Sequence, residues 1–507
     1  MSVELLFPNP PKHWRVTTLG ELAKDSGGDI QTGPFGSQLH ASDYVEDGIP
    51  SIMPKNISID SILTDDISRV SRSDLERLSK YKVRIGDIVY SRRGDVEKCA
   101  RITSAEDGWI CGTGCLRVRV LPKEVSAEYL HAYLCHPAVR EWILRHAVGA
   151  TMPNLNTSIL SSLPVLIPSK EEMRFISSLW LSFSQKIQLN HQINQTLEQM
   201  AQALFKSWFV DFEPVKAKIA ARERWQALQS EHELASPVRD AAGLDEPPAE
   251  GDLETTMNRA AMQAISGKTA VQLDALRAED PERYNELYET AALFPSAMQG
   301  SELGEIPEGW EVLPLSRMIQ LIGGGTPKKS EPTFWNGEIY WFSVKDVPQN
   351  GNVFVIDTED KITKEGLLNS STKLLPIGTT IITARGTVGK VALTGVETAM
   401  NQSCYGIVSG DNSGPYLNYL RVKLAVETLK RNTHGAVFDT ITRSTFDTVS
   451  QVQAPSFIRN NFENMVDPFF KKINCKLRQS KTLSELRNTL LPKLLSGEVS
   501  ASNRGKL

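Results

Sequence analysis

The sequence lacks the features that would place it in a membrane or outside the cell. No run of about 18 apolar residues occurs, so no segment is predicted to cross a bilayer. The first fourteen residues, MSVELLFPNPPKHW, have neither a basic start nor a long apolar run, so no secretory signal is predicted. Only six cysteines occur, without the spacing of a disulfide framework. These absences predict a cytoplasmic protein with reduced thiols.

Recognisable catalytic and metal-binding motifs are also absent. Cys111 and Cys115 form a close pair, but no second Cys/His pair at ligand spacing accompanies them. Asn9-Pro10-Pro11-Lys12 has lysine where an amino-methyltransferase would carry an aromatic residue. In the glycine-rich stretch 323–330, Pro327 removes a backbone donor that a phosphate-binding loop needs. We therefore expect neither a catalytic site nor a metal site in this chain.

A strong positive charge is missing as well, because the formal net charge is −4. The negative charge is concentrated in one segment. Residues 231–310 hold 17 Asp and Glu against 5 Lys and Arg, a net charge of −12. The remainder of the chain therefore carries +8. Two mildly basic flanks around an acidic middle are compatible with a phosphate-facing surface on the flanks.

The sequence does contain an internal duplication. Ile85–Lys98 (IGDIVYSRRGDVEK) recurs without a gap as Ile377–Lys390 (IGTTIITARGTVGK). Each copy predicts a strand that runs into an Arg-Gly turn, where Arg93 or Arg385 projects from the rim of a sheet. A β-hairpin with a solvated arginine would explain one copy alone. Two copies indicate that a whole unit is repeated.

Further segments follow in the same order in both halves. They are Trp14 and Trp310, the glycine-rich loops 31–38 and 323–329, the short strands 49–52 and 339–342, the strand-like stretches 109–120 and 399–408, the helices 126–146 and 415–432, and the segments 149–156 and 435–442. Strands and helices alternate within each half. This order predicts an α+β protein with two mixed α/β domains related by a pseudo-two-fold duplication.

Each half ends in a long predicted helix. Apolar residues from Ile176 to Trp208 recur alternately every four and three residues, and an offset of 286 maps most of them onto Phe462 to Leu494. This 3.5-residue period is typical of a coiled-coil seam. About 40 residues at 1.5 Å each would make a rod of about 60 Å. We predict paired rods; the alternative is two amphipathic helices that each pack on their own domain.

Polar residues interrupt both predicted seams. Asn190 and Asn194 do so in the first helix, and Lys476, Ser480 and Arg487 do so in the second. Polar seam residues commonly fix the register and number of helices at some cost in stability. In addition, Ser169 with Glu172 fits a capping box, and Pro468 is expected to kink the start of the second helix.

Several short motifs follow one another in a fixed order. They are His13-Trp14 with Leu19-Gly20-Glu21-Leu22, the stretch from Gly33 to Leu39 (GPFGSQL), the two Arg-Gly strands, the stretch from Ala203 to Phe212 (ALFKSWFVDF), the stretches SELG from Ser301 and IPEGW from Ile306, and the tail from Leu490 to Glu498 (LLPKLLSGE). Each is weak alone. In this order the chain resembles, over nearly its whole length, the specificity (S) subunit of Type I restriction-modification enzymes.

The resemblance implies both a fold and partners. It implies two target-recognition domains, each reading one half of a bipartite, asymmetric double-stranded DNA site, and a spacer made of two long antiparallel helices. Half-sites about one helical turn apart, near 34–36 Å, would suit such a spacer. Two methyltransferase (M) subunits would dock on this chain, and restriction/translocase (R) subunits would join them.

The family implies that this chain is non-catalytic and binds no cofactor. The M subunit would use S-adenosylmethionine, and the R subunit would use ATP and Mg²⁺. The chain would divide into a first target-recognition domain (1–168), a first helix (169–213), an acidic, partly helical insertion (214–300), a second target-recognition domain (301–455), a second helix (456–498) and a flexible tail (499–507). One alternative is a coiled-coil adaptor without DNA contact. Another is a fused methyltransferase or nuclease, for which the motifs are missing.

Candidate DNA contacts come from the glycine-rich loops, the Arg-Gly turns and the segments beside them, because their side chains can bond phosphates and base edges. They are Thr32, Phe35, Ser37, Gln38, Lys55, Arg92, Arg93, Lys98, Asn154, Asn156, Thr326, Lys328, Lys329, Lys345, Arg385, Lys390, Asn401 and Gln402. Phe205, Trp208 and Phe209 are large for the end of a seam, and we expect them to be left exposed for M-subunit docking. Alternatively, they seal the helix end against the domains.

Overall fold

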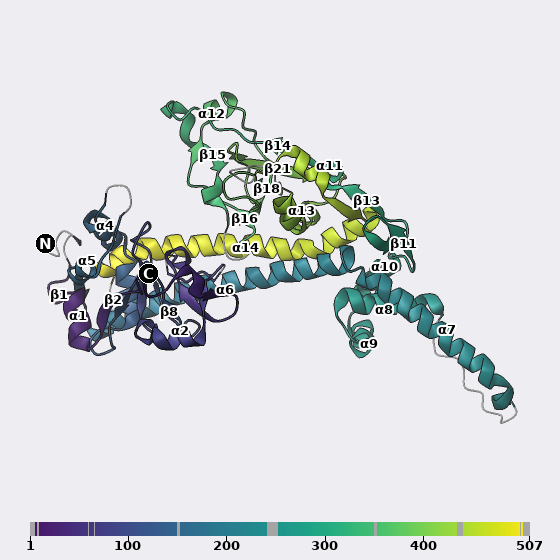
Figure 1. Ribbon diagram of the computed structural model, residues 1–507, viewed down its shortest axis with the longest axis horizontal. Coiled ribbons are helices and arrows are strands. Elements are labelled where there is room, and N and C mark those ends of the chain that lie inside the picture. The colour runs from purple at the N-terminus through teal and green to yellow at the C-terminus, as the bar shows by residue number, and fades with distance from the viewer. Residues whose placement is uncertain are drawn as a thin grey trace. The chain divides into compact units, whose positions relative to one another are not determined.

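The computed structural model describes residues 6–7, 10–58, 60–64, 66–149, 153–240, 252–348, 352–432, 440–496 and 498–499 (Figure 1). The chain divides into two compact units. The first unit combines residues 1–191 with 479–507, and the second consists of residues 192–478. Each unit therefore contains one half of each of two 40-residue helices, α6 (Lys170–Phe209) and α14 (Ser456–Leu495).

The first unit is built around a four-stranded antiparallel sheet of order β2-β9-β6-β7. A smaller sheet, β3-β5-β4-β8, contains the parallel pair β4–β8, and β1 pairs with β10. The strands are β1 (Arg15–Thr18), β2 (Asp29–Thr32), β3 (Tyr44–Val45), β4 (Ile49–Ile52), β5 (Arg69–Val70), β6 (Ile88–Ser91), β7 (Cys99–Arg101), β8 (Ile110–Cys111), β9 (Cys115–Arg119) and β10 (Pro164–Ile167). The helices besides α6 are α1 (Leu19–Ser26), α2 (Arg72–Arg77), α3 (Ala127–Leu134), α4 (Pro137–His146) and α5 (Thr157–Ser161).

The second unit repeats this plan and adds helices. Its main sheet has the order β14-β21-β18-β19-β16, its smaller sheet β17-β15-β20 contains the parallel pair β15–β20, and β13 pairs with β22. The strands are β11 (Met298–Ser301), β12 (Gly304–Pro307), β13 (Glu311–Pro314), β14 (Ile319–Gly323), β15 (Trp335–Phe342), β16 (Phe354–Val355), β17 (Lys361–Ile362), β18 (Thr380–Thr383), β19 (Val391–Thr394), β20 (Thr398–Met400), β21 (Cys404–Ser409) and β22 (Ser450–Gln453). The helices besides α14 are α7 (Glu213–Asp240), α8 (Leu253–Ser266), α9 (Ala270–Glu279), α10 (Pro281–Ala292), α11 (Leu315–Met318), α12 (Lys364–Leu368) and α13 (Pro415–Arg431).

The two units match strand for strand in their central parts. The main sheets correspond in the order β2, β9, β6, β7 and β14, β21, β18, β19. The parallel pair β4–β8 corresponds to β15–β20, and the antiparallel pair β1–β10 corresponds to β13–β22. The predicted fold class, two mixed α/β domains related by duplication, is confirmed. It follows from the repeated sequence, because both copies carry the same apolar strands and glycine positions.

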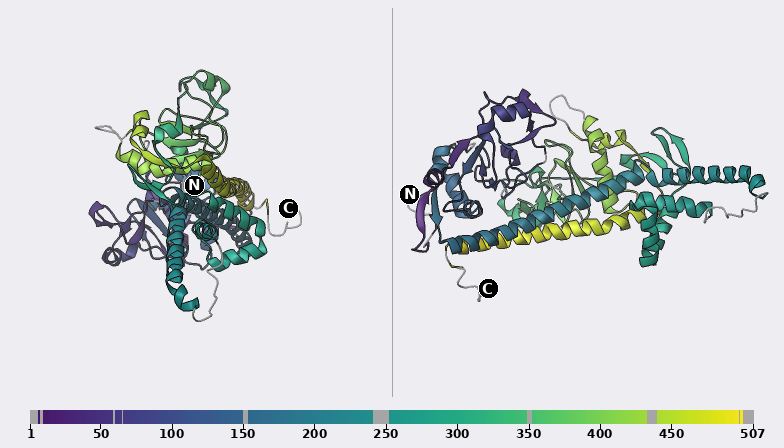
Figure 2. Two further views of the ribbon diagram at one scale, coloured as in Figure 1. Left: turned by 90° about the vertical axis from the view of Figure 1, so that its right-hand side faces the viewer. Right: turned by 90° about the horizontal axis from the view of Figure 1, so that it is seen from below.

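The long helices run antiparallel, as each unit shows by itself (Figure 2). In the first unit the beginning of α6 packs on the end of α14, where Trp180 and Leu494 belong to one buried cluster. There Asn190 Nδ2 donates to Ser480 Oγ at 3.2 Å, so two polar seam residues pair. In the second unit the end of α6 packs on the beginning of α14, where Phe205 contacts Phe462.

One detail of the predicted second helix is corrected. The offset of 286 places Phe469 and Leu490 in the apolar seam, but both are only partly buried, and their neighbours Phe470 and Leu491 are buried instead. Pro468 lies well inside α14, which begins at Ser456 and continues through it to Leu495. The capping box is as expected: the Glu172 amide donates to Ser169 Oγ at 3.3 Å, and the Ser169 amide donates to Glu172 at 3.0 Å.

The helix predicted over 126–146 is two helices. α3 ends at Leu134 and α4 begins at Pro137, because proline has no amide donor and disfavours helical geometry at the residue before it, here His136 in extended conformation. The strand-like stretches 109–120 and 399–408 are each two strands joined by a turn.

The acidic insertion is more helical than expected. Within the predicted insertion 214–300, α7 reaches Asp240 and α8 begins at Leu253 behind the N-cap Asp252. Residues 241–251 lie outside the described residues, as do 150–152, 433–439 and 500–507 of the predicted loops and tail. No helix of the described residues is long and apolar enough to span a bilayer.

Candidate nucleic-acid interface

The first Arg-Gly turn follows β6 and is fixed by backbone hydrogen bonds on both sides. Arg92 N–H donates to the Gly114 carbonyl at 2.8 Å, and Leu155 N–H donates to the Arg92 carbonyl at 2.9 Å. Arg93 forms an isolated β-bridge with Asn154. Gly94 has φ of 75°, which an L-residue rarely adopts. The turn is therefore rigidly placed while the Arg93 side chain is exposed.

The second Arg-Gly turn has the same three backbone contacts. Ala384 N–H donates to the Ser403 carbonyl at 2.7 Å, and Ile441 N–H donates to the Ala384 carbonyl at 3.0 Å. Arg385 forms an isolated β-bridge with Thr440, and Gly386 has φ of 77°. The exposed Arg385 thus occupies the position of Arg93 in its own unit.

Each turn lies near a glycine-rich loop that another backbone approaches closely. A Cβ added to Gly33 would lie 2.0 Å from the Gly112 carbonyl oxygen, and one added to Gly324 would lie 1.9 Å from that of Asn401. No side chain fits at either position. The glycines therefore bring each loop against the turn that leads into β9 or β21.

In the first unit, a cation–π contact joins the loop to the turn. The Arg92 guanidinium lies 5.9 Å from the centre of the Phe35 ring, and Phe35 is 54% exposed. Ser37 beside it is exposed. Lys55 is exposed in the short 3₁₀ turn Pro54–Asn56, whose proline is next to Gly114. An exposed aromatic ring beside basic side chains can meet both bases and phosphates.

In the second unit, the loop and turn meet through polar side chains. The Thr326 hydroxyl donates to Gln402 Oε1, and Gln402 precedes Ser403, whose carbonyl binds the Arg-Gly turn. Lys328 and Lys329 are exposed in the same loop, and Lys390 is exposed at the base of β19. The two units therefore present different side chains from the same backbone frame.

The candidate residues fall into two groups by what their side chains do. Among the described residues, six basic candidates make no ion pair or side-chain hydrogen bond: Lys55, Arg93, Lys328, Lys329, Arg385 and Lys390. Several others bind a neighbouring group of the fold. Gln38 Oε1 accepts from the Tyr81 hydroxyl at 2.7 Å, and Asn156 caps α5 through the Ile159 amide at 2.8 Å.

Four further candidates are engaged less firmly. Lys98 pairs with Asp95, and Lys345 lies 3.4 Å from Glu359. Both are partly or fully exposed pairs of the kind that contributes little, so either lysine can exchange its partner for a phosphate. Asn401 Oδ1 accepts from the Ser403 amide at 3.0 Å, and Thr32 pairs with Leu116 in the sheet.

Two residues of this interface were not among the predicted ones. Ser403 and Thr440 supply the backbone partners of the second turn. Thr440 lies 286 positions after Asn154, the offset that relates the long helices. Aligning the two halves with that offset would have identified it.

The three aromatic residues expected to be exposed are buried. Phe205, Trp208 and Phe209 are 7%, 0% and 8% exposed. Trp208 packs edge-on against Phe294 at 4.9 Å and Phe462 at 5.5 Å. Such large rings fill the core between helices, so the exposure on which the docking prediction rested is wrong. The rings do seal the helix end, as the alternative proposed.

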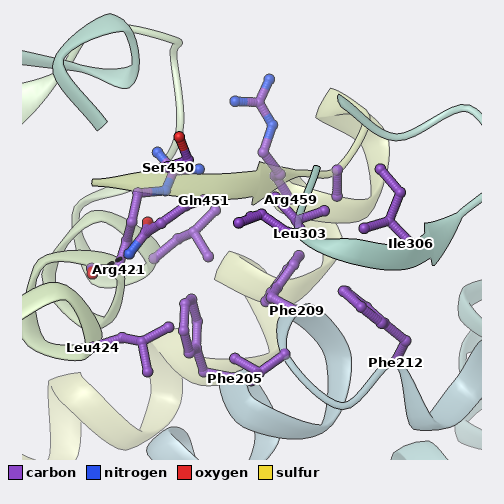
Figure 3. Close-up of a pocket in the computed structure, with 14 residues that line it drawn as sticks. Phe205, Phe209, Phe212, Leu303, Ile306, Arg421, Leu424, Ser450, Gln451 and Arg459 are labelled. Atoms are coloured by element: carbon purple, nitrogen blue, oxygen red, sulfur yellow. Dashed lines mark hydrogen bonds between the residues drawn. The ribbon is translucent and has the colours of Figure 1, made fainter. Parts of the chain in front are cut away.

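Two of these rings also line a pocket of about 220 Å³ (Figure 3). Phe205 and Phe209 form its floor, and Leu303 and Leu424, each about half exposed, lie at its rim. Docking of a partner subunit at this pocket stays a prediction.

The arginines of this pocket already have a partner. Arg421 and Arg459 both pair with Asp411. Burial raises the pKa of Asp411, but Arg421, hydrogen bonds from Ser413 and Ser409, and Arg459 together lower it to about 2. The pocket is therefore largely apolar, and the two arginines and one aspartate leave a formal charge of +1 at one side.

Comparison with known proteins identifies the family. The model of the Type I restriction modification DNA specificity domain matches residues 11–199 and 307–452. The chain belongs to this family. The specificity subunit of the Type I restriction enzyme HindI from Haemophilus influenzae is 33% identical over 445 residues, covering 86% of this chain and 90% of that protein.

Other specificity subunits are more distant. The MjaIX subunit of Methanocaldococcus jannaschii is 23% identical, covering 96% of this chain and 94% of that protein. The crystal structure of the Type I S subunit from M. genitalium covers 96% of this chain and 97% of that one at 12% identity and a TM-score of 0.40. This chain is a Type I specificity subunit, a non-catalytic component of a restriction-modification system.

Proposed function

We propose that this specificity subunit reads a bipartite, asymmetric DNA site, one half-site with each Arg-Gly turn and the glycine-rich loop beside it. The observation that carries the proposal is the paired geometry of Arg93 and Arg385. Each lies in a turn fixed by the same three backbone contacts, and each has an exposed side chain without a partner among the described residues.

The chemistry of these surfaces supports the proposal. Arginine presents a planar fork that bonds bidentately to the O6 and N7 atoms of guanine or to a phosphate. A rigid backbone lowers the entropy lost when such a side chain binds. The six unpaired basic side chains supply phosphate contacts, and the differing residues around the two turns favour two different half-sites.

We further propose that the chain assembles M and R subunits on itself. Its basic excess outside residues 231–310 is only +8. Phosphate contacts carry much of DNA affinity, so the chain alone is expected to bind DNA poorly. The M subunits, with S-adenosylmethionine, would add basic surface and the methylation chemistry, and the R subunits, with ATP and Mg²⁺, would add cleavage.

The test begins by mapping methylated positions in the host genome, which gives the site. Binding of that duplex is then measured with M subunits present and absent. Arg93→Ala and Arg385→Ala are each expected to weaken binding by about 1–3 kcal/mol if the contact is to a base edge. Each variant should relax the sequence preference in one half-site only.

Matched controls separate base contacts from charge. Arg93→Lys and Arg385→Lys keep the positive charge but lose the planar guanidinium. They should therefore retain DNA affinity only where the arginine binds a phosphate. Lys24→Ala and Arg317→Ala change exposed basic residues that precede β2 and β14, at the ends away from the glycine-rich loops, and should bind as wild type. Wild-type binding by both alanine variants at the turns would make the arginines structural and favour the adaptor alternative.

A further inference from the structure

The core of the first unit contains a compact group of two thiols and an imidazole. Cys99 begins β7, His131 lies in α3, and Cys135 caps the end of that helix. The three residues are 2%, 2% and 6% exposed. Their ligand atoms all lie within 4.8 Å of one another. The break before Pro137 ends α3 at this point, which directs the Cys135 thiol toward β7.

The distances match those between ligands of a tetrahedral zinc ion. Bonds of about 2.3 Å to sulfur and about 2.0–2.1 Å to nitrogen separate two sulfur ligands by about 3.8 Å, and a sulfur from a nitrogen by about 3.5 Å. The sulfurs of Cys99 and Cys135 are 3.8 Å apart. Cys135 Sγ lies 3.4 Å from His131 Nε2. A disulfide would need these sulfurs much closer, at about 2.05 Å.

We propose that Cys99, His131 and Cys135 bind a structural Zn²⁺ ion. Two thiolates and one Zn²⁺ sum to zero charge, which suits a fully buried site. The three residues supply three of the four ligands of a tetrahedral zinc ion. Spacing along the chain does not predict this site, because Cys99 precedes His131 by 32 positions.

A carboxylate behind the histidine completes the arrangement. Asp60 Oδ1 lies 3.5 Å from His131 Nδ1, so it favours the tautomer whose Nε2 lone pair faces the thiols. Asp60 is held in turn by the Ser184 hydroxyl at 2.5 Å and by an ion pair with Arg487. Its amide donates to the Cys99 carbonyl at 3.1 Å. The proposed ion would thus link β7 and α3 to both long helices.

Cys111 is a thiol as deeply buried in the same unit, and it lies outside this group of three residues. It therefore serves as a matched control.

The test is the metal content of the full-length chain, purified without chelators, alone or with any subunits that co-purify. About one zinc per chain is expected, as for a structural site in which metal binding is coupled to folding. After metal removal, Co²⁺ should bind with the absorption of a tetrahedral cobalt–thiolate centre, and Zn²⁺ should displace it. Trace zinc together with no cobalt–thiolate absorption would overturn the proposal.

Single substitutions test which residues bind the zinc ion. Cys135→Ser is expected to lose the zinc, and Cys111→Ser is expected to keep it. If Cys135→Ser does not fold, Asp60→Asn provides the second test. It leaves all three ligands in place and should lower zinc affinity by about 10–100-fold. Zinc retained by a folded Cys135→Ser variant, or lost from Cys111→Ser, would assign the metal elsewhere and refute the site.

Discussion

Replacing Trp208 by alanine should destabilise the second unit strongly and affect partner binding only through that loss. The side chain is fully buried, and a tryptophan buries about 150–250 Å². At about 25 cal/mol per Å² this area corresponds to about 4–6 kcal/mol. Alanine keeps a small part of it, and measured Trp→Ala changes cost about 3–5 kcal/mol. For a unit of this size the melting temperature should fall by on the order of 10 °C.

Calorimetry is the suitable assay, because two compact units can unfold in separate transitions. Trp208→Phe provides a graded control. It leaves a smaller cavity and removes the indole N–H, which has no hydrogen-bond partner among the described residues, so its cost should be clearly lower. Leu424→Ala, about half exposed at the pocket rim, should cost well under 1 kcal/mol.

The same variants decide between core and docking roles. Below its melting temperature, Trp208→Ala should still recruit M subunits. Unchanged thermal stability combined with lost M binding would refute the burial argument and restore the docking role first expected for this residue.

Three further outcomes are expected. Asp411 has a pKa of about 2, below its ordinary 3.8, so its carboxylate stabilises the fold fully above pH 3.8. About 2 kcal/mol of the free energy of unfolding is lost as pH falls toward 2. Urea midpoints measured against pH should show this loss, and the Asp411→Asn variant should not show it. Gly386→Ala should lower the free energy of unfolding by about 1 kcal/mol, because only the φ of this position is unfavourable for alanine. Gly324→Ala should lower it several times more, because the added Cβ would overlap the Asn401 carbonyl. Equal urea midpoints for the two variants would contradict this. Removing one heptad from each of α6 and α14 should shorten the spacer in the DNA site by about 10 Å, about three base pairs, while the mapped half-site bases stay the same. A deletion that changes those bases but keeps the spacer would refute the role of the helices as a ruler.

The duplicated fold was predictable because it is encoded locally. The ungapped match of the two Arg-Gly strands and the apolar period of the helices depend only on spacing along the chain. The Arg-Gly turns, in which Gly94 and Gly386 have positive φ, were predicted for the same reason. Pro137 shows the limit of this reasoning, since the apolar pattern of 126–146 continues across a residue that ends a helix.

The state of some candidate side chains was not predictable, because it depends on partners far away in sequence. Gln38 is engaged by Tyr81, 43 positions later. A large aromatic residue at the end of a seam indicates burial as much as exposure. Trp208 is buried partly by Phe294, which belongs to the acidic insertion 214–300 and lies 86 positions later. The Cys99–His131–Cys135 group was missed because folding, not spacing, brings its members together.

The first unit contains residues 479–507 from the end of the chain, and this has a consequence for synthesis on the ribosome. The core of the first unit includes Leu491, Leu494 and Leu495, which are translated after all of residues 192–478. At about 5–20 residues per second, roughly 15 to 60 seconds pass before these leucines can arrive. During that time the apolar face of α6 that includes Trp180 lacks its partner residues from α14, so the core of the first unit is expected to be completed only after them. A premature stop near the C-terminus would therefore damage the domain made first.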